Sequence, residues 1–276
     1  MYFINTVFTL GRGLVPPESV ARDGRYLVGG NPLEGCYLLH VIEGFLVRER
    51  ASRVVKAELQ HRNIWDFQAC DPSYGSPYPG RIPGQIVTNL LCHYTEPGAL
   101  IIDPMAGSGT TVDVCRRLDR RVEAFDIRPA RSEICRADVL QGVPLPSGCA
   151  DFVFLDPPYW DMKRGCYSAE PTDLSQLSYE AFLGALESLR DETYRLLKVD
   201  GCCALLISSR KKHGTYYDLA FEGFNIFRKV LSPIERICVP YHYSYSETTG
   251  EWASWRAPGK LLRAFRDLMV FVKAAN

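Results

Sequence analysis

The chain has 276 residues, 46% of them hydrophobic, and its acidic and basic residues balance to a formal net charge of zero. This length and composition can fill the core of one large α/β domain with a smaller appendage. The balanced charge excludes an acidic disordered chain and a protein that binds polyanions over its whole surface, so a nucleic-acid partner would have to be met by a local patch.

The ten cysteines are scattered and lack the paired Cys and His spacing of a zinc site, which favours buried thiols in a reducing compartment over disulfides or a metal. No stretch approaches the roughly 18 apolar residues of a membrane span. Residues 1–14 lack the basic start and long apolar run of a signal peptide. We therefore expect a soluble cytoplasmic protein with no membrane partner.

The first part of the chain ends at a connector rich in proline, glycine and tyrosine, DPSYGSPYPGRIPG (71–84). We expect residues 1–70 to form an N-terminal appendage for target recognition or oligomerisation, and residues 71–276 to form the main domain. Within the appendage, the basic run at 48–56 is most simply a solvated face. That run consists of Arg48, Arg50, Arg53 and Lys56.

After the connector, helical and strand patterns alternate, which predicts a doubly wound, mostly parallel sheet of α/β class. The expected helices lie at 85–94, 110–118, 178–197 and 217–230. The expected strands lie at 99–103, 121–126, 152–155 and 203–208, with another just before Asp138 and a closing antiparallel hairpin from 235–243 and 267–274. In such sheets, ligands bind beyond the carboxyl ends of the strands.

A glycine turn, DPMAGSGTT (103–111), links the strand at 99–103 to the next helix. Gly107 and Gly109 let the backbone approach a ligand closely, and the start of the helix offers unpaired N–H groups. A P-loop would need lysine where Thr110 stands, and a dinucleotide site would need a third glycine. The turn therefore disfavours both nucleoside triphosphates and NAD.

Three carboxylates, Asp103, Asp126 and Asp138, fall at the ends of neighbouring predicted strands. Asp126 follows Gly107 by 19 residues, about where a carboxylate binds ribose hydroxyls in doubly wound folds. The set suits a ligand with an ammonium group, a ribose and an amino-purine. S-adenosylmethionine has all three.

The strand at 152–155 ends in DPPYW (156–160), where two prolines stop strand pairing and stiffen the turn. The Asp156 carboxylate and the Pro157 carbonyl can each accept one N–H from an exocyclic amine, so that the nitrogen lone pair can point at a methyl group. Tyr159, with Trp160 as a second candidate, would stack on the base. A base in a duplex must be flipped out to reach such a site.

Together, DPMAGSGTT and DPPYW resemble the motifs of the DNA amino-methyltransferases, the N6-adenine and N4-cytosine methylases. The resemblance of the chain to this family covers about residues 60–274. The resemblance implies a seven-stranded, Rossmann-like class I methyltransferase. It implies cofactor contacts from Asp103, Met105, Gly107, Gly109, Thr110, Asp126 and Asp138. It also implies that Asp156, Pro157, Pro158 and Tyr159 hold the target amine, with adenine N6 favoured because aspartate precedes PPY.

Two features depart from that family. Only 11 residues separate Asp126 from Asp138, so the helix normally found there is cut to about one turn. No long insertion follows DPPYW, so target recognition falls to the N-terminal 70 residues or to the loops 160–173 and 244–260, which can equally be ordinary surface loops. The aromatic and basic candidates for nucleic-acid binding are Trp160, Lys163, Arg164, Trp252, Trp255, Arg256 and Lys260.

Three other methyl acceptors stay open besides adenine N6: cytosine N4 in DNA, guanine N2 in RNA, and glutamine in a protein. A catalytically silent nucleic-acid-binding module is an alternative of a different class. Carbon-5 methylation of cytosine is disfavoured, because it needs a nucleophilic cysteine that usually follows proline, and the chain has no Pro-Cys pair. DNA is the expected partner, with RNA as the alternative. The sequence leaves open whether the chain forms a homodimer and whether it serves restriction-modification or regulation.

Overall fold

The computed structural model describes residues 27–28, 31–32, 59–241 and 264–275. The chain divides into two compact units, Met1–Ala57 and Glu58–Asn276. In the first unit, strands β1 (Leu27–Val28) and β2 (Asn31–Pro32) pair antiparallel. The basic run at 48–56 and the loop 244–260 lie outside the described residues, and the appendage boundary expected at residue 70 stays a prediction.

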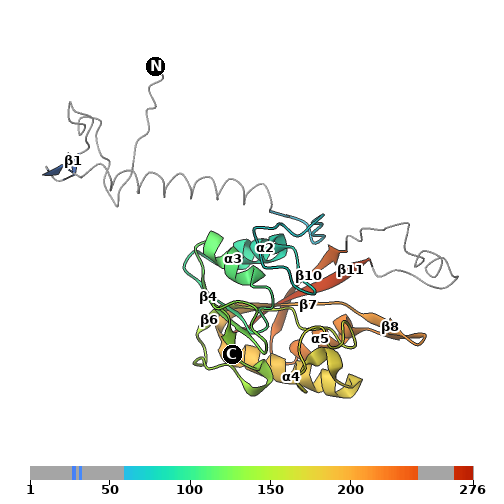
Figure 1. The fold of residues 1–276 in the computed structure, drawn as a ribbon. Helices are drawn as coiled ribbons and strands as arrows, with labels where there is room; N and C mark the ends of the chain where they lie inside the picture. The colour runs from blue at the N-terminus through green and yellow to red at the C-terminus, as the bar shows by residue number, and fades with distance from the viewer. Residues whose placement is uncertain (1–26, 29–30, 33–58, 242–263, 276) are drawn as a thin grey trace. The chain divides into compact units, whose positions relative to one another are not determined.

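A seven-stranded sheet forms the centre of the second unit, in the order β10-β11-β7-β6-β3-β4-β5 (Figure 1). Strands β3 to β7 pair in parallel with one another, whereas β11 is antiparallel to both β7 and β10. The doubly wound, mostly parallel sheet expected from the sequence is therefore confirmed. The strands are β3 (Leu100–Asp103), β4 (Arg121–Asp126), β5 (Cys135–Arg136), β6 (Ala150–Leu155), β7 (Leu197–Ile207), β10 (Ser232–Pro240) and β11 (Phe265–Val272).

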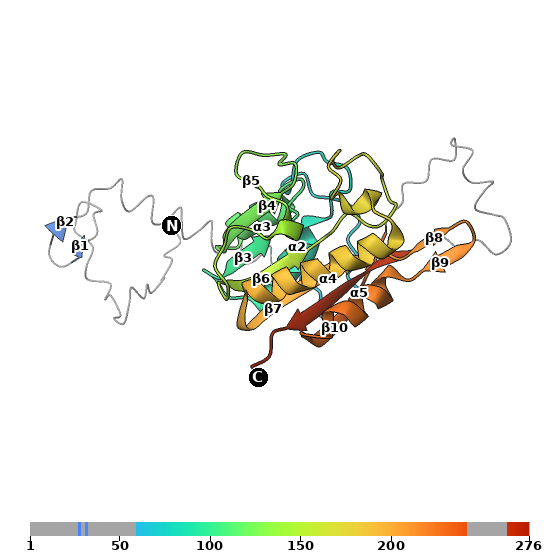
Figure 2. The ribbon, with the colours of Figure 1, turned by 90° about the horizontal axis from the view of Figure 1, so that it is seen from below.

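Helices cover both faces of this sheet, as Figure 1 and Figure 2 show: α2 and α3 lie on one face, α4 and α5 on the other. The helices are α2 (Gly84–Tyr94), α3 (Thr110–Arg117), α4 (Tyr179–Leu196) and α5 (Leu219–Phe227), with short 3-10 helices η2 (Val139–Gln141) and η3 (Leu174–Gln176). Ser178 caps α4 by accepting the N–H of Ala181. In the described part of the chain, no helix has the length and apolar character to cross a membrane.

The central strands position the site. Residues of β6 and β7 such as Phe152 and Leu205 are fully buried, as expected for strands covered by helices on both faces. Because β3, β4 and β6 run parallel, their carboxyl ends share one edge of the sheet. That edge carries Asp103, Asp126 and, directly after β6, Asp156.

Two segments differ from the elements expected from the sequence. Strand β7 begins at Leu197, six residues before the expected strand at 203–208. The helix expected at 217–230 begins only at Leu219, where the Asp218 side chain caps it by accepting the N–H of Phe221. The residues before it form an antiparallel hairpin of β8 (Arg210–Lys212) and β9 (Thr215–Tyr217), where no strand was expected from the sequence.

Candidate active site

A cavity of about 490 Å³ lies at the carboxyl ends of β3, β4 and β6. Its walls come from the glycine turn after β3, the turn after β6, and connector residues 78–82. Of the residues predicted to hold the cofactor or the target amine, all except Gly109 line it. They are Asp103, Met105, Gly107, Thr110, Asp126, Asp138, Asp156, Pro157, Pro158 and Tyr159. The two predicted half-sites thus share one cavity.

The two glycines of the turn have different roles. Gly107 lines the cavity at φ +46°, and a Cβ there would lie 3.1 Å from the Tyr78 ring. Gly109 is the N-cap of α3 at φ +80°, and its Cβ would lie 2.7 Å from Nη1 of Arg131. Both backbone conformations favour glycine. Gly109 therefore shapes the start of α3 and makes room for Arg131, rather than lining the cavity.

Asp126 fixes the glycine turn from the end of β4. Its Oδ2 accepts the N–H of Gly107 at 2.8 Å, and its Oδ1 accepts the N–H of Arg128 at 2.8 Å. The residue is only 7% exposed, and burial raises the pKa of its carboxyl group. Each carboxylate oxygen can accept more than one hydrogen bond, so Asp126 can hold the turn and a ligand hydroxyl at once.

Asp103 and Asp138 complete the group of carboxylates. Asp103 is 3% exposed, its Oδ1 accepts the N–H of Met105 at 3.1 Å, and burial raises its pKa to about 7. Because burial disfavours the charged carboxylate, a cationic ligand group would be a favourable partner there. Asp138 lies two residues beyond β5 and caps η2 through an Oδ1 that accepts the N–H of Leu140.

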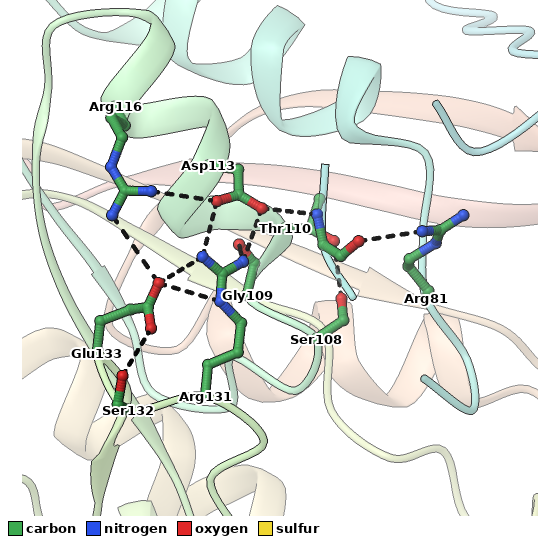
Figure 3. A network of polar contacts seen from close by, with 10 residues as sticks. Arg81, Ser108, Gly109, Thr110, Asp113, Arg116, Arg131, Ser132 and Glu133 are labelled. Carbon is green, nitrogen blue, oxygen red and sulfur yellow. Dashed lines mark hydrogen bonds and ion pairs between the residues drawn. The ribbon is translucent and has the colours of Figure 1, made fainter. Parts of the chain in front are cut away.

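In place of a helix, the connection between β4 and β5 holds a cluster of ion pairs (Figure 3). The Arg131 guanidinium binds both oxygens of Asp113 on α3, at 2.7 and 2.9 Å, and also contacts Glu133. Asp113 in turn accepts the N–H of Gly75 at 2.8 Å, and the Gly75 carbonyl accepts from Arg81 at 3.1 Å. The cluster ties the connector, the glycine turn and this loop together.

We expect Arg131→Ala to lower the free energy of unfolding by about 1–3 kcal/mol, since it breaks a two-point pair whose side chains are only 15% and 18% exposed. Denaturant titration measures the change. The matched control is Arg136→Ala, because Arg136 pairs with Glu170 while 73% exposed, and its loss should cost less than about 1 kcal/mol. Equal losses in the two variants would contradict a structural role for the cluster.

At the other end of the cavity, Asp156 and Tyr159 act as a pair. The Tyr159 hydroxyl donates to Oδ1 of Asp156 at 3.0 Å. Loss of hydration on burial raises the pKa of Asp156 to about 6, although the Arg266 cation and this hydrogen bond act in the opposite direction. A carboxylate with this pKa is largely ionised at neutral pH and can accept hydrogen bonds from an amine.

The sequence analysis missed several residues that line the cavity: Tyr78, Arg81, Met162, Tyr167, Asp173, Tyr241 and Arg266. Arg266 is the most consequential, because it is a cation close enough to lower the pKa of Asp156. It is 8% exposed, and its Nε has no hydrogen-bond partner among the described residues. A charged residue within the apolar strand at 265–272 was the signal that could have identified it.

The nucleic-acid candidates are dispersed. Lys163 is exposed and lines the cavity, and exposed Arg164 pairs with Asp161 at 3.3 Å. Trp160 is a core residue: it is 6% exposed, its Nε1 donates to the Leu177 carbonyl, and it does not line the cavity. The remaining candidates, Trp252, Trp255, Arg256 and Lys260, lie outside the described residues.

Comparison with known proteins links the chain to DNA methylases. The family model N6_N4_Mtase, described as DNA methylase, matches residues 43–136. The Type II methyltransferase M.SmaI of Serratia marcescens is 25% identical over 99 residues, which cover 34% of this chain and 32% of that protein. The chain thus matches about a third of this relative's length. The two matches confirm the resemblance stated from the motifs, and S-adenosylmethionine is the methyl donor of that family.

Two solved structures also resemble the chain. TrmN from Thermus thermophilus is 17% identical with a TM-score of 0.46, and the match covers 70% of this chain and 49% of TrmN. A geranyl diphosphate methyltransferase in complex with GPP and sinefungin is 15% identical with a TM-score of 0.47, covering 83% of this chain and 94% of that one.

Proposed function

From the resemblance to the N6-adenine and N4-cytosine DNA methylases, we propose that this chain transfers the methyl group of S-adenosylmethionine to the exocyclic amino group of a flipped-out DNA base, with adenine N6 as the favoured target. One observation supports this most strongly. A single cavity is lined by the carboxylates Asp103, Asp126 and Asp138 and also by the turn that holds Asp156 and Tyr159.

The cofactor half of the cavity fits S-adenosylmethionine in chemistry, and the whole cavity has the size of a small-molecule site. Buried Asp103 suits the ammonium group, Asp126 suits the ribose hydroxyls, and Asp138 suits the amino group of the adenine. The volume of about 490 Å³ falls in the range of roughly 300–1,000 Å³ typical of small-molecule sites. When bound, the cofactor supplies a methyl group on a positively charged sulfur.

In the proposed reaction, Asp156 positions the target amine. Its ionised carboxylate accepts one N–H and the Pro157 carbonyl accepts the other, so the nitrogen lone pair faces the methyl carbon. Bound S-adenosylmethionine would supply the methyl group and leave as S-adenosylhomocysteine, and Asp156 would accept the proton that the methylated nitrogen loses. The Tyr159 hydroxyl, hydrogen-bonded to Asp156, helps to keep that carboxylate charged and in place.

This mechanism predicts a pH dependence. With S-adenosylmethionine saturating, so that Asp103 is paired with its ammonium group, kcat/KM for DNA should fall as the pH drops through about 6, because only ionised Asp156 can accept the amine N–H. Tyr159→Phe removes a hydrogen bond that favours the charged form, so the pKa of Asp156 should rise and the acid limb should move to higher pH. An acid limb that stays at the wild-type pH in Tyr159→Phe would contradict this role.

The matched control for that experiment is Tyr194→Phe. Tyr194 lies near the end of α4, and its ring contacts the Lys273 ammonium, a contact that phenylalanine retains. The pH profile of this variant should match the wild type. A shift in both variants would show that loss of any tyrosine hydroxyl changes the profile.

Product analysis tests the proposed function directly. The protein is incubated with DNA, and in parallel with RNA, in the presence of S-adenosylmethionine that carries an isotopically labelled methyl group. The nucleic acid is then digested to nucleosides and the labelled product is identified by mass. Labelled N6-methyladenine supports the full proposal, and N4-methylcytosine supports the reaction but corrects the base. Label in RNA alone, or in neither polymer, overturns it.

Calorimetry with S-adenosylmethionine separates an enzyme from a silent binding module. The proposal requires a saturable heat of binding by the full chain, because Asp103, Asp126 and Asp138 converge on one cavity. DNA binding without cofactor binding would instead favour a module that kept the fold and lost the reaction.

A further inference from the structure

A basic β-hairpin projects from the domain beside the edge of the sheet that carries the cavity (Figure 1, Figure 2). It follows the carboxyl end of β7, and its sequence is RKKHGTYY (210–217). Its two-residue turn consists of His213 and Gly214, which have φ values of 47° and 84°. Positive φ at both turn residues matches the twist of paired strands, so the turn suits a regular, well-defined hairpin.

The inner face of the hairpin holds it against the turn that follows the DPPYW segment. Arg210 and Lys212 share this face because side chains alternate along a strand. Arg210 Nη2 lies 2.9 Å from Oδ2 of Asp161, and Lys212 Nζ lies 3.0 Å from its Oδ1. On the same face, the Tyr217 ring lies 4.6 Å from the ring of Trp160.

Asp161 is an anchor rather than a surface charge. Its side chain is 9% exposed, its φ is +55°, and it lies five residues after Asp156. A non-glycine residue at positive φ is strained and persists only where its surroundings hold it. The hairpin is therefore fixed to the same short segment as the proposed catalytic carboxylate.

The outer face of the hairpin carries groups suited to phosphate. Lys211 and Tyr216 lie directly opposite each other in the strand pair, and both are exposed, Tyr216 by 60%. His213, at the turn, is also exposed. Lysine and tyrosine side chains are common donors to the phosphate oxygens of DNA. Three cations, Arg164, Arg210 and Lys212, pair with the single carboxylate of Asp161.

We propose that this outer face, formed by Lys211 and Tyr216 with His213 at the turn, binds the phosphate backbone of DNA next to the base held at Asp156. The inference rests on the proposed function and specifies the DNA contact that it requires. It places this contact outside the three segments considered from the sequence, which were the N-terminal 70 residues and the loops 160–173 and 244–260. The ion pairs to Asp161 would then set the distance between backbone and catalytic site.

Binding of the full chain to fluorescent duplexes of random sequence, at several NaCl concentrations, tests the hairpin. Each lysine–phosphate contact contributes about 0.9 to the slope of log affinity against log salt. Lys211→Ala should therefore reduce the slope by about one and weaken binding about eightfold near 0.1 M salt. Tyr216→Phe loses one neutral hydrogen bond and should weaken binding roughly two- to tenfold with the slope unchanged.

The matched control is Lys229→Ala. Lys229 is an exposed lysine just beyond the carboxyl end of α5, where it pairs with Glu187. Its removal should leave affinity and slope as in the wild type. Calorimetry with S-adenosylmethionine should give the same cofactor affinity in all variants, because none of the three side chains lines the cavity.

The outcomes separate this inference from the proposed function. If the wild type methylates DNA while Lys211→Ala binds with unchanged affinity and slope, the hairpin proposal is overturned and the proposed function stands. If Lys229→Ala weakens binding as much as Lys211→Ala, binding is diffuse and the hairpin proposal again fails. If the wild type neither binds nor methylates DNA, both proposals fall.

Discussion

Asp156→Ala should reduce methyl transfer by at least about a thousandfold while leaving the affinity for S-adenosylmethionine nearly unchanged. The substitution removes the charged acceptor that positions the target amine, and loss of one such preorganised group costs about 10²–10³ in rate, with misplacement of the nucleophile adding to it. Cofactor affinity should survive because Asp103, Asp126 and Asp138 are untouched. Single-turnover methylation and calorimetry measure the two quantities.

Two further variants sharpen this experiment. Asp156→Asn keeps the side-chain volume but loses the charge, and its amide would compete with the target amine for acceptors, so it should be nearly as slow as Asp156→Ala. Asp191→Ala makes the same substitution as Asp156→Ala at an exposed aspartate on α4 and should retain full activity. Wild-type rates in Asp156→Ala would refute the mechanism.

The parts of the candidate site that could be predicted from the sequence are those that local pattern and sheet geometry determine together. Asp103, Asp126 and Asp156 each follow an apolar strand, and parallel neighbouring strands must bring their carboxyl ends to one edge. The alternation of helices and strands sufficed to predict this without any knowledge of side-chain contacts. The same logic placed Asp138 just beyond β5, although that strand has only two residues.

Contacts between distant segments could not be predicted in this way. Trp160 packs edge-on against Tyr179 and beside Tyr217, and no local pattern distinguishes a tryptophan buried by such partners from one that stacks on a base. Arg266 reaches the cavity only because β11 pairs beside β7. Gly109 resembles a ligand-binding glycine in sequence, yet it is required for the left-handed N-cap and for the space that Arg131 fills.

The expected effect of Asp126→Ala is the converse of that of Asp156→Ala: cofactor affinity should fall by about 10–100-fold, since hydrogen bonds to a charged group are worth roughly 1.5–3 kcal/mol. Calorimetry with S-adenosylmethionine measures the loss. Glu123→Ala, which removes an exposed carboxylate from the same strand, is the matched control and should bind as the wild type does. An unchanged affinity in Asp126→Ala would exclude Asp126 from the cofactor site.

Asp126 can act on the cofactor in two ways. It can bind the ribose hydroxyls directly, and it can hold the glycine turn in place, because its carboxylate also accepts the N–H groups of Gly107 and Arg128. A double-mutant cycle separates them. The affinities of wild type and Asp126→Ala are compared for S-adenosylhomocysteine and for an analogue without ribose hydroxyls. If Asp126 binds those hydroxyls, the wild type should prefer the full ligand and Asp126→Ala should lose that preference. A preference that persists undiminished in the variant would mean that Asp126 acts only by holding the glycine turn in place.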